Sequence, residues 1–193
     1  PEAKLRNAIT TLECNVSRVP DLSTYAGLES LKINFSGGFK GTDLNGLGRL
    51  AKLKSLTLST GQVMYGDVRA TLQSLSGLDA PLLEAFDATF LDLADIDALS
   101  GCRKLKRVNI RGNRRITSID SLKPSAGTLE DLDIGSCSGI ASLKPLREAT
   151  RLRILDLVGL GLITDLLDLK KLAHLEMIEP SGCERLTSFT GLP

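Results

Sequence analysis

The sequence predicts an α/β right-handed solenoid, a coil in which each turn adds one strand to a curved parallel sheet. A phrase of spaced aliphatic residues recurs along the chain at nearly constant intervals. The first part of the phrase alternates between apolar and other residues, the period of a strand with one buried face. Its second part places apolar residues three positions apart, which is typical of a 3₁₀ or short helical return.

The strand and return pattern is clearest in the second half of the chain. The copy that begins at Leu105 reads L-x-x-V-x-I-x-x-N-x-x-I-x-x-I-x-x-L. Copies at Leu129, Leu152 and Leu175 keep these offsets, and the successive starts are 24, 23 and 23 residues apart. A tighter copy begins at Leu83, which is 22 residues before Leu105. Five consecutive copies indicate a repeat array.

The first half keeps only the strand part of the phrase. Weaker copies begin at Ile9, Leu28 and Leu53, and the irregular intervals place insertions in the second and third of them. We therefore expect a single domain over residues 1–193 with about eight turns, which forms part of a longer protein. The predicted strand phrases begin near residues 9, 28, 53, 83, 105, 129, 152 and 175.

These residues resemble the leucine-rich repeat, L-x-x-L-x-L-x-x-N/C-x-L, over nearly the whole chain. The return part resembles the short subclass found in internalins and phosphatase regulators. The resemblance implies that the strands line a concave face. It also implies that the Asn or Cys of each copy points inward and satisfies backbone groups, a position matched by Asn113, Cys137 and Cys183. Leu91, Leu160 and Gly61 depart from it, so we expect interruptions there.

Elementary energetics agree with a stacked coil. Burying one Leu side chain is worth roughly 1.5–3 kcal/mol, and a single repeat is too small to hide its own. Stacking neighbouring turns buries all of them. Pro180 stands where other copies have Ile or Leu, and a proline cannot donate to a sheet ladder, so we expect the last strand to be an edge or distorted.

Composition excludes several classes of function. The 24 Lys and Arg balance 23 Asp and Glu, so the net charge of +1 gives no overall field for nucleic acid or an anionic membrane. The most apolar stretch, residues 152–169, is interrupted by aspartates, which argues against a membrane span. Four dispersed cysteines and one histidine lack metal-site spacing, so we expect no metal or cofactor.

Recognition should depend on the outward residues of the strands. The central column, the residue between the two inward positions of each strand, is mainly acidic. The first column, the residue two places earlier, becomes mixed in charge and then apolar toward the C-terminus. The insertions are a second candidate surface, through Phe39 and Tyr65. The predicted partner-binding residues on the concave face are Asp87, Arg107, Asn109, Arg111, Asp131, Asp133, Asp156 and Glu179.

Two charge patterns leave alternatives open. Asp133, Asp156 and Glu179 should repel one another in neighbouring strands, which a basic partner would relieve, although a solvated face also tolerates carboxylates. Arg107 should lie beside Asp131, as an internal pair or as a partner contact. The basic segment 103–115 has no interleaved aromatic residues, so a solvated face is favoured there over nucleic-acid binding.

Two short matches to cofactor-binding and catalytic motifs do not indicate an enzyme. Residues Gly46–Ala51 match the dinucleotide-binding fingerprint, but no predicted strand precedes them. Residues Gly135–Gly139 resemble a nucleophile elbow with Cys137 as the nucleophile, but Cys137 already has an inward position in the repeat. We therefore expect a monomeric, non-enzymatic module that binds a protein partner through its concave face. An extracellular adhesin-type fragment and a regulatory or substrate-recognition arm of an enzyme are the alternatives. The cysteines stand at core-like repeat positions, which favours a cytoplasmic location. The N-glycosylation sequons at Asn15 and Asn34 argue slightly against it.

Overall fold

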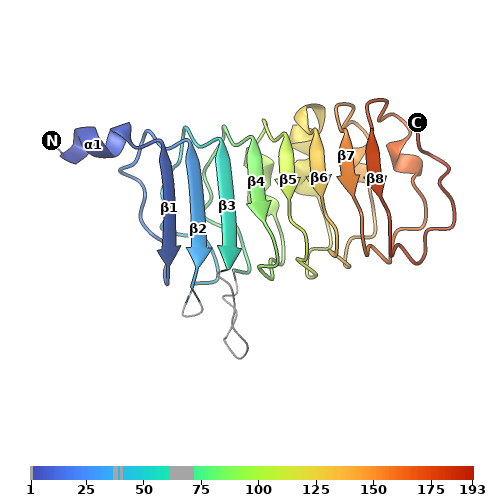
Figure 1. The fold of residues 1–193 in the computed structure, drawn as a ribbon, viewed down its shortest axis with the longest axis horizontal. Coiled ribbons are helices and arrows are strands. Elements are labelled where there is room, and N and C mark those ends of the chain that lie inside the picture. Colours follow the sequence, from blue (N-terminus) through green and yellow to red (C-terminus); the bar gives the residue numbers. More distant parts are fainter. Residues whose placement is uncertain (1, 37–38, 40, 61–71) are drawn as a thin grey trace.

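The computed structural model describes residues 2–36, 39, 41–60 and 72–193. Within these residues one parallel sheet of eight strands follows the order of the sequence (Figure 1). Each strand lies at the alternating part of one predicted phrase. The strands are β1 (Thr11–Val16), β2 (Ser30–Phe35), β3 (Ser55–Thr60), β4 (Ala85–Ala88), β5 (Arg107–Asn109), β6 (Asp131–Asp133), β7 (Ile154–Asp156) and β8 (Met177–Glu179).

Strand register follows the repeat phrase. Leu132 of β6 lies opposite Leu155 of β7, and Leu155 lies opposite Ile178 of β8. Leu132 and Leu155 are fully buried, whereas the residues on either side of them point to the opposite face. This alternation confirms the predicted two-residue period.

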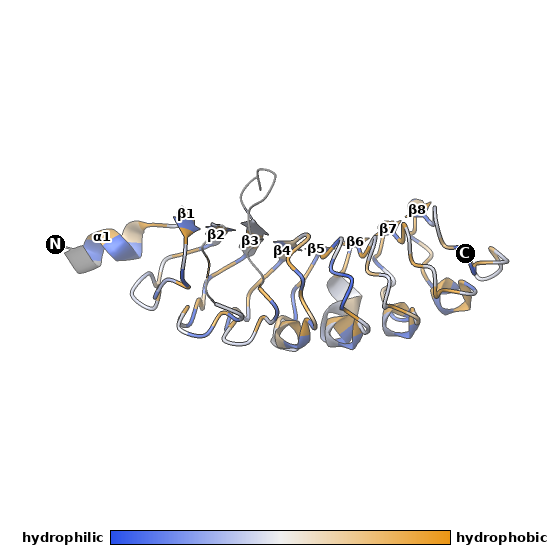
Figure 2. Cartoon of the chain, turned by 90° about the horizontal axis from the view of Figure 1, so that it is seen from below, coloured by the Kyte–Doolittle hydropathy of each residue, from blue (hydrophilic) through white to orange (hydrophobic). Residues whose placement is uncertain are grey.

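The returns lie on one side of the sheet, and the sheet lines the inner side of a shallow arc (Figure 2). Every third residue of the Leu105 copy after its strand, Ile116, Ile119 and Leu122, is buried in the core between sheet and returns. A 3₁₀ turn contains three residues, so this spacing keeps the apolar side chains on one side. The helices in the returns are η1 (Asp97–Gly101), η2 (Asp120–Thr128), η3 (Lys144–Leu146) and η4 (Leu167–Leu169).

The inward polar position has the role that the resemblance implied. Asn113 is fully buried, and its amide bonds backbone groups of its own coil and the preceding one. Cys137 and Cys183 each donate from Sγ to a carbonyl of the preceding coil. Leu91 and Leu160, which stand at the same repeat position, are fully buried, and their hydrocarbon side chains cannot make such a bond. Gly61 lies outside the described residues.

The ends of the sheet differ. Helix α1 (Glu2–Ala8) precedes β1, and the sequence pattern did not predict it. β8 is the opposite edge, as expected from Pro180. In the coil before it, the N–H of Leu157 donates to the carbonyl of Glu179, and Pro180 at the equivalent place has no N–H to donate. Among the described residues, no helix has the length and apolar character needed to cross a bilayer.

Candidate functional site on the concave face

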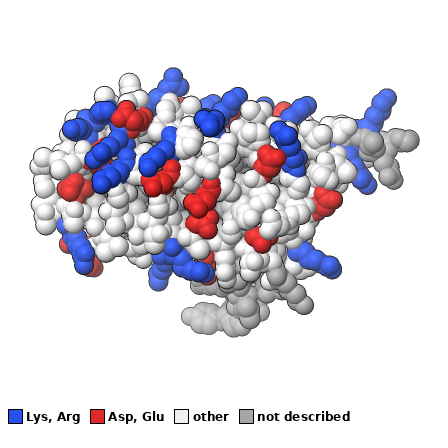
Figure 3. All heavy atoms as spheres, turned by 180° about the vertical axis from the view of Figure 1, so that it is seen from behind, with Lys and Arg blue, Asp and Glu red and all other residues white. Residues whose placement is uncertain are grey.

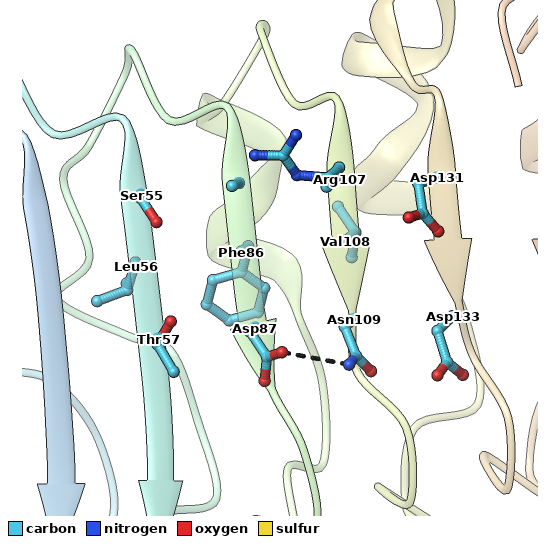
Figure 4. Close-up of a pocket in the computed structure, with 11 residues that line it drawn as sticks. Ser55, Leu56, Thr57, Phe86, Asp87, Arg107, Val108, Asn109, Asp131 and Asp133 are labelled. Carbon is cyan, nitrogen blue, oxygen red and sulfur yellow. Dashed lines mark hydrogen bonds between the residues drawn. The ribbon is translucent and has the colours of Figure 1, made fainter. Parts of the chain in front are cut away.

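The predicted recognition residues all lie on the face of the sheet opposite the returns, but the structure divides them. Five line one open hollow of about 310 Å³ above β3 to β6 (Figure 4). The others belong to β7, to β8 and to the turn after β5. The five in the hollow are Asp87, Arg107, Asn109, Asp131 and Asp133, beside Ser55, Thr57 and Ala85 from β3 and β4.

Asp87 and Asp131 are two partly buried carboxylates that line the hollow. Among the described residues, no Lys or Arg nitrogen lies within ion-pair distance of either one. Burial, with a smaller contribution from the charge of Asp133, raises the pKa of both side chains. The Asn109 amide donates to Asp87 at 3.2 Å and opposes that rise. A cation placed here would relieve an existing cost.

Arg107 is exposed, and its guanidinium extends toward β4 and away from Asp131 (Figure 4). The two residues are neighbours in the register, as predicted. The charge of Arg107 partly opposes the raised pKa of Asp131, but the two groups do not form an ion pair. Among the described residues, Arg107 has no carboxylate within 4 Å, so its charge is available to a partner.

Arg111 corrects the interpretation of the acidic column. Its Nη1 lies 2.7 Å from Asp156 Oδ2 and 3.3 Å from Asp133 Oδ1, and all three side chains are less than one-third exposed. The hydrogen bond to Asp156 is the largest cause of a raised Arg111 pKa. The repulsion between these two aspartates is therefore relieved within the chain and does not require a basic partner.

The central column also has a local structural role. In the last four strands, β5 to β8, a side-chain oxygen of the central-column residue accepts a hydrogen bond from the backbone N–H two residues later, as in an Asx turn. The turns that end these four strands are stabilised in this way, which explains much of the acidic character there without recognition. The bonds are Arg111 N to Asn109 at 3.1 Å, Gly135 N to Asp133 at 2.8 Å, Val158 N to Asp156 at 2.8 Å and Ser181 N to Glu179 at 3.0 Å.

The last four residues of the first column lie side by side across the C-terminal half of the sheet. Arg107, Asp131, Ile154 and Met177 are consecutive neighbours across β5 to β8. Ile154 is 38% exposed and Met177 is 58% exposed, although both belong to the sheet. Two oppositely charged side chains, which do not pair with each other, therefore lie directly beside two exposed apolar side chains.

The predicted loop site is not supported by Phe39. Its ring is buried and packs against Phe35 with ring centroids 4.4 Å apart, so Phe39 belongs to the core. The expectation that it offers its ring to a partner was wrong, because position in an insertion does not determine burial. Tyr65 lies outside the described residues.

The basic segment 103–115 is partly neutralised by ion pairs with neighbouring coils. Lys106 pairs with Glu84 at 2.7 Å, and Arg115 pairs with Asp92 at 3.3 Å. Positive and negative side chains are interspersed over the return face (Figure 3). This distribution fits the solvated surface that was favoured over a nucleic-acid site.

One charged row was missed by the sequence analysis. The residue immediately before each strand alternates in sign from β2 to β8, and three consecutive-coil pairs in the row have nitrogen–oxygen distances of 2.7 to 2.8 Å. Reading the column before each strand would have revealed it. This rim row consists of Glu29, Lys54, Glu84, Lys106, Glu130, Arg153 and Glu176.

The strand order, the 3₁₀ returns and the inward Asn and Cys position define the chain as a leucine-rich-repeat solenoid. Its structure is similar to internalin C2 from Listeria monocytogenes, with a TM-score of 0.61 and 20% identity over 98% of this chain and 81% of that one. It is also similar to the leucine-rich-repeat domain of the type III effector XopL, with a TM-score of 0.52 and 18% identity over 99% and 68%. No family model and no curated protein matches the sequence.

Proposed function

We propose that the chain is a protein-interaction module that binds its partner through the concave face of β4 to β8. The observation that carries this proposal is the first column, where, within the described part of the chain, Arg107 and Asp131 lack ion-pair partners beside exposed Ile154 and Met177. Interface centres are rich in apolar contacts, and oppositely charged groups that meet across an interface add specificity. The similarity to the leucine-rich-repeat domains of an internalin and an effector supports the fold on which this surface depends.

Binding fits the geometry better than catalysis. The hollow is open, its ionisable groups are carboxylates and one guanidinium, and among the described residues the hydroxyls of Ser55 and Thr57 that line it are not hydrogen-bonded to any of these carboxylates. The cysteines do not supply a reactive thiol either. Burial raises the pKa of the Cys102 and Cys137 thiols to about 11, so little thiolate exists at neutral pH. His174 lines a separate hollow at the rim, with Arg151 and Glu176.

A comparative pull-down from the source cells tests this function. The bait variant D87N/R107A/D131N removes one cation and two carboxylates from the hollow. The matched control D97N/R114A/E184Q removes the same charges from exposed positions outside the hollow. We expect wild type and control to retain a protein that the concave-face variant releases.

The retained protein should then be titrated against all three baits by calorimetry. We expect the concave-face variant to weaken binding at least about tenfold, which corresponds to about 1.4 kcal/mol, and the control to match wild type. Equal affinities for the concave-face variant and wild type would place the binding surface elsewhere.

A further inference from the structure

Resting on the proposed function, we propose that the first column receives an amphipathic helix of the partner protein. The helix lies across β5 to β8 and presents an acidic, a basic and two aliphatic side chains, in that order along its axis. They face Arg107, Asp131, Ile154 and Met177 respectively.

The chemistry of the helix follows from the charged and apolar groups that the described residues of the chain leave without a partner. Asp133 and Asp156 are bound by Arg111 and by backbone N–H groups, so the central column offers little to a partner. Arg107 can bind a carboxylate of the partner, and Asp131 can bind an ammonium or guanidinium group. An aliphatic pair would cover Ile154 and Met177 and remove apolar area from water.

The spacing of the column favours a helix over an extended segment. Neighbouring strands in a sheet are about 4.8 Å apart, so the four residues lie near 0, 4.8, 9.6 and 14.4 Å along a line across the strands. A helix rises about 1.5 Å per residue, which places side chains i, i+3, i+7 and i+10 near 0, 4.5, 10.5 and 15 Å. These four positions also share one face.

An extended segment fits the column poorly. Its same-face residues are about 6.7 Å apart, so the second one already lies about 2 Å from the nearest strand position. Toward the N-terminal coils, the column continues as the small residues Ala85 and Ser55, which line the hollow. Their size leaves the hollow open beside the Arg107 guanidinium, which extends toward β4 (Figure 4), so an acidic side chain of the helix can reach it there.

Two designed peptides provide the probe. Both are alanine-rich and about 17 residues long, enough for a helix that spans the column. The matched peptide carries Glu, Lys, Leu and Leu at i, i+3, i+7 and i+10, and the exchanged peptide has Lys and Glu in each other's places. A scrambled peptide of the same composition distributes the four residues around the helix. Each is titrated into the isotopically labelled chain by NMR.

We expect the matched peptide to shift amides of β5 to β8 and to bind at least about tenfold more tightly than the scrambled peptide. The variant R107D/D131R should invert the preference and favour the exchanged peptide. The double variant I154S/M177S should weaken both. The control E148K/K171E, which exchanges an ion pair in the returns, should keep the wild-type preference. Thermal unfolding of each variant verifies that it is folded.

Equal binding of the matched and scrambled peptides, an unchanged preference in R107D/D131R, or shifts confined to the returns would overturn the proposal. Self-association of the chain that I154S/M177S abolishes would assign the surface to a second copy and would also overturn it. If the pull-down still depends on the concave face while the peptides fail, the proposed function stands and only the helix is rejected.

Discussion

The amide of Asn113 satisfies four backbone groups in the interior of the solenoid. It accepts from the N–H groups of Leu91 and Leu93 at 3.1 and 3.0 Å, and it donates to the carbonyls of Ala88 and Ile110, each at 2.7 Å. A buried backbone group without a partner costs about 1–3 kcal/mol, and the costs at one site are not additive. One side chain thus joins two coils at their turn.

The variant N113A should therefore be strongly destabilised. We expect a loss of about 2–4 kcal/mol in the free energy of unfolding, measured by urea denaturation at neutral pH. C137A is the matched comparison, because Cys137 occupies the same repeat position and makes one thiol bond to the Ile110 carbonyl. It should cost clearly less. Equal losses for the two variants would show that volume, and not hydrogen bonding, determines the stability at this position.

At the residue scale, the sequence predicted positions better than contacts. The repeat phrase assigned Asn113 and Cys137 inward places because those places recur with the period of the coil. The clamp of Arg111 on Asp133 and Asp156 crosses from one column to the next over three coils, and a list of columns does not contain the direction of a long side chain. The burial of Phe39 depends on the path of an insertion, for which the repeat offers no template.

At the scale of the strands, the rim row joins each coil to the next through charge. The row alternates in sign, so each interior member lies between two opposite charges of neighbouring coils. Glu84 illustrates this arrangement. Lys106 lowers its pKa, first by a hydrogen bond and then by its charge, and Lys54 adds a smaller effect. An opposite charge at any interior position of the row would therefore place like charges opposite each other on two neighbouring coils.

The variant E84K tests the rim row, with E84Q as the neutral control. Because the pKa of Glu84 is lowered on folding, its stabilising effect is present above the ordinary glutamate pKa and is lost as the pH falls through the lowered value. We expect the melting temperature at neutral pH to decrease in the order wild type, E84Q, E84K. The differences should shrink in about 1 M salt, and the difference between wild type and E84Q should vanish in acid. A salt-independent order would contradict this origin.

The strands were predicted more completely than the other elements, and the reason is physical. A strand buried on one face must alternate, so its period is visible in the phrase, and the repeat interval sets its neighbour. Helix α1 contains no repeat phrase, and its Leu5 is 68% exposed, so no buried stripe marked it in the sequence. The raised pKa of Asp87 and Asp131 was equally invisible, because it depends on how deeply the sheet face buries each carboxylate.

At the scale of the whole molecule, each coil contacts only its neighbours, so stability depends on position in the stack. Interior coils pack on both sides, whereas β1 and β8 each have one neighbouring strand. Leu155 in β7 is fully buried, while Ile178 at the equivalent place in β8 and Leu12 in β1 are only half-buried. The free energy of local opening should therefore rise from both edges toward the middle.

Native-state hydrogen exchange measures this gradient directly. We expect the smallest protection in β1 and β8 and the largest in β4 to β6, because opening an edge coil breaks one interface and opening an interior coil breaks two. The variant L132A removes a fully buried side chain from β6 and should lower the most protected amides together, whereas I178A should affect β8 and its neighbours only. Uniform protection in all eight strands would show one cooperative unit. A graded profile would also mean that a partner bound across β5 to β8 stabilises the C-terminal edge most, since the least stable coil gains a second interface.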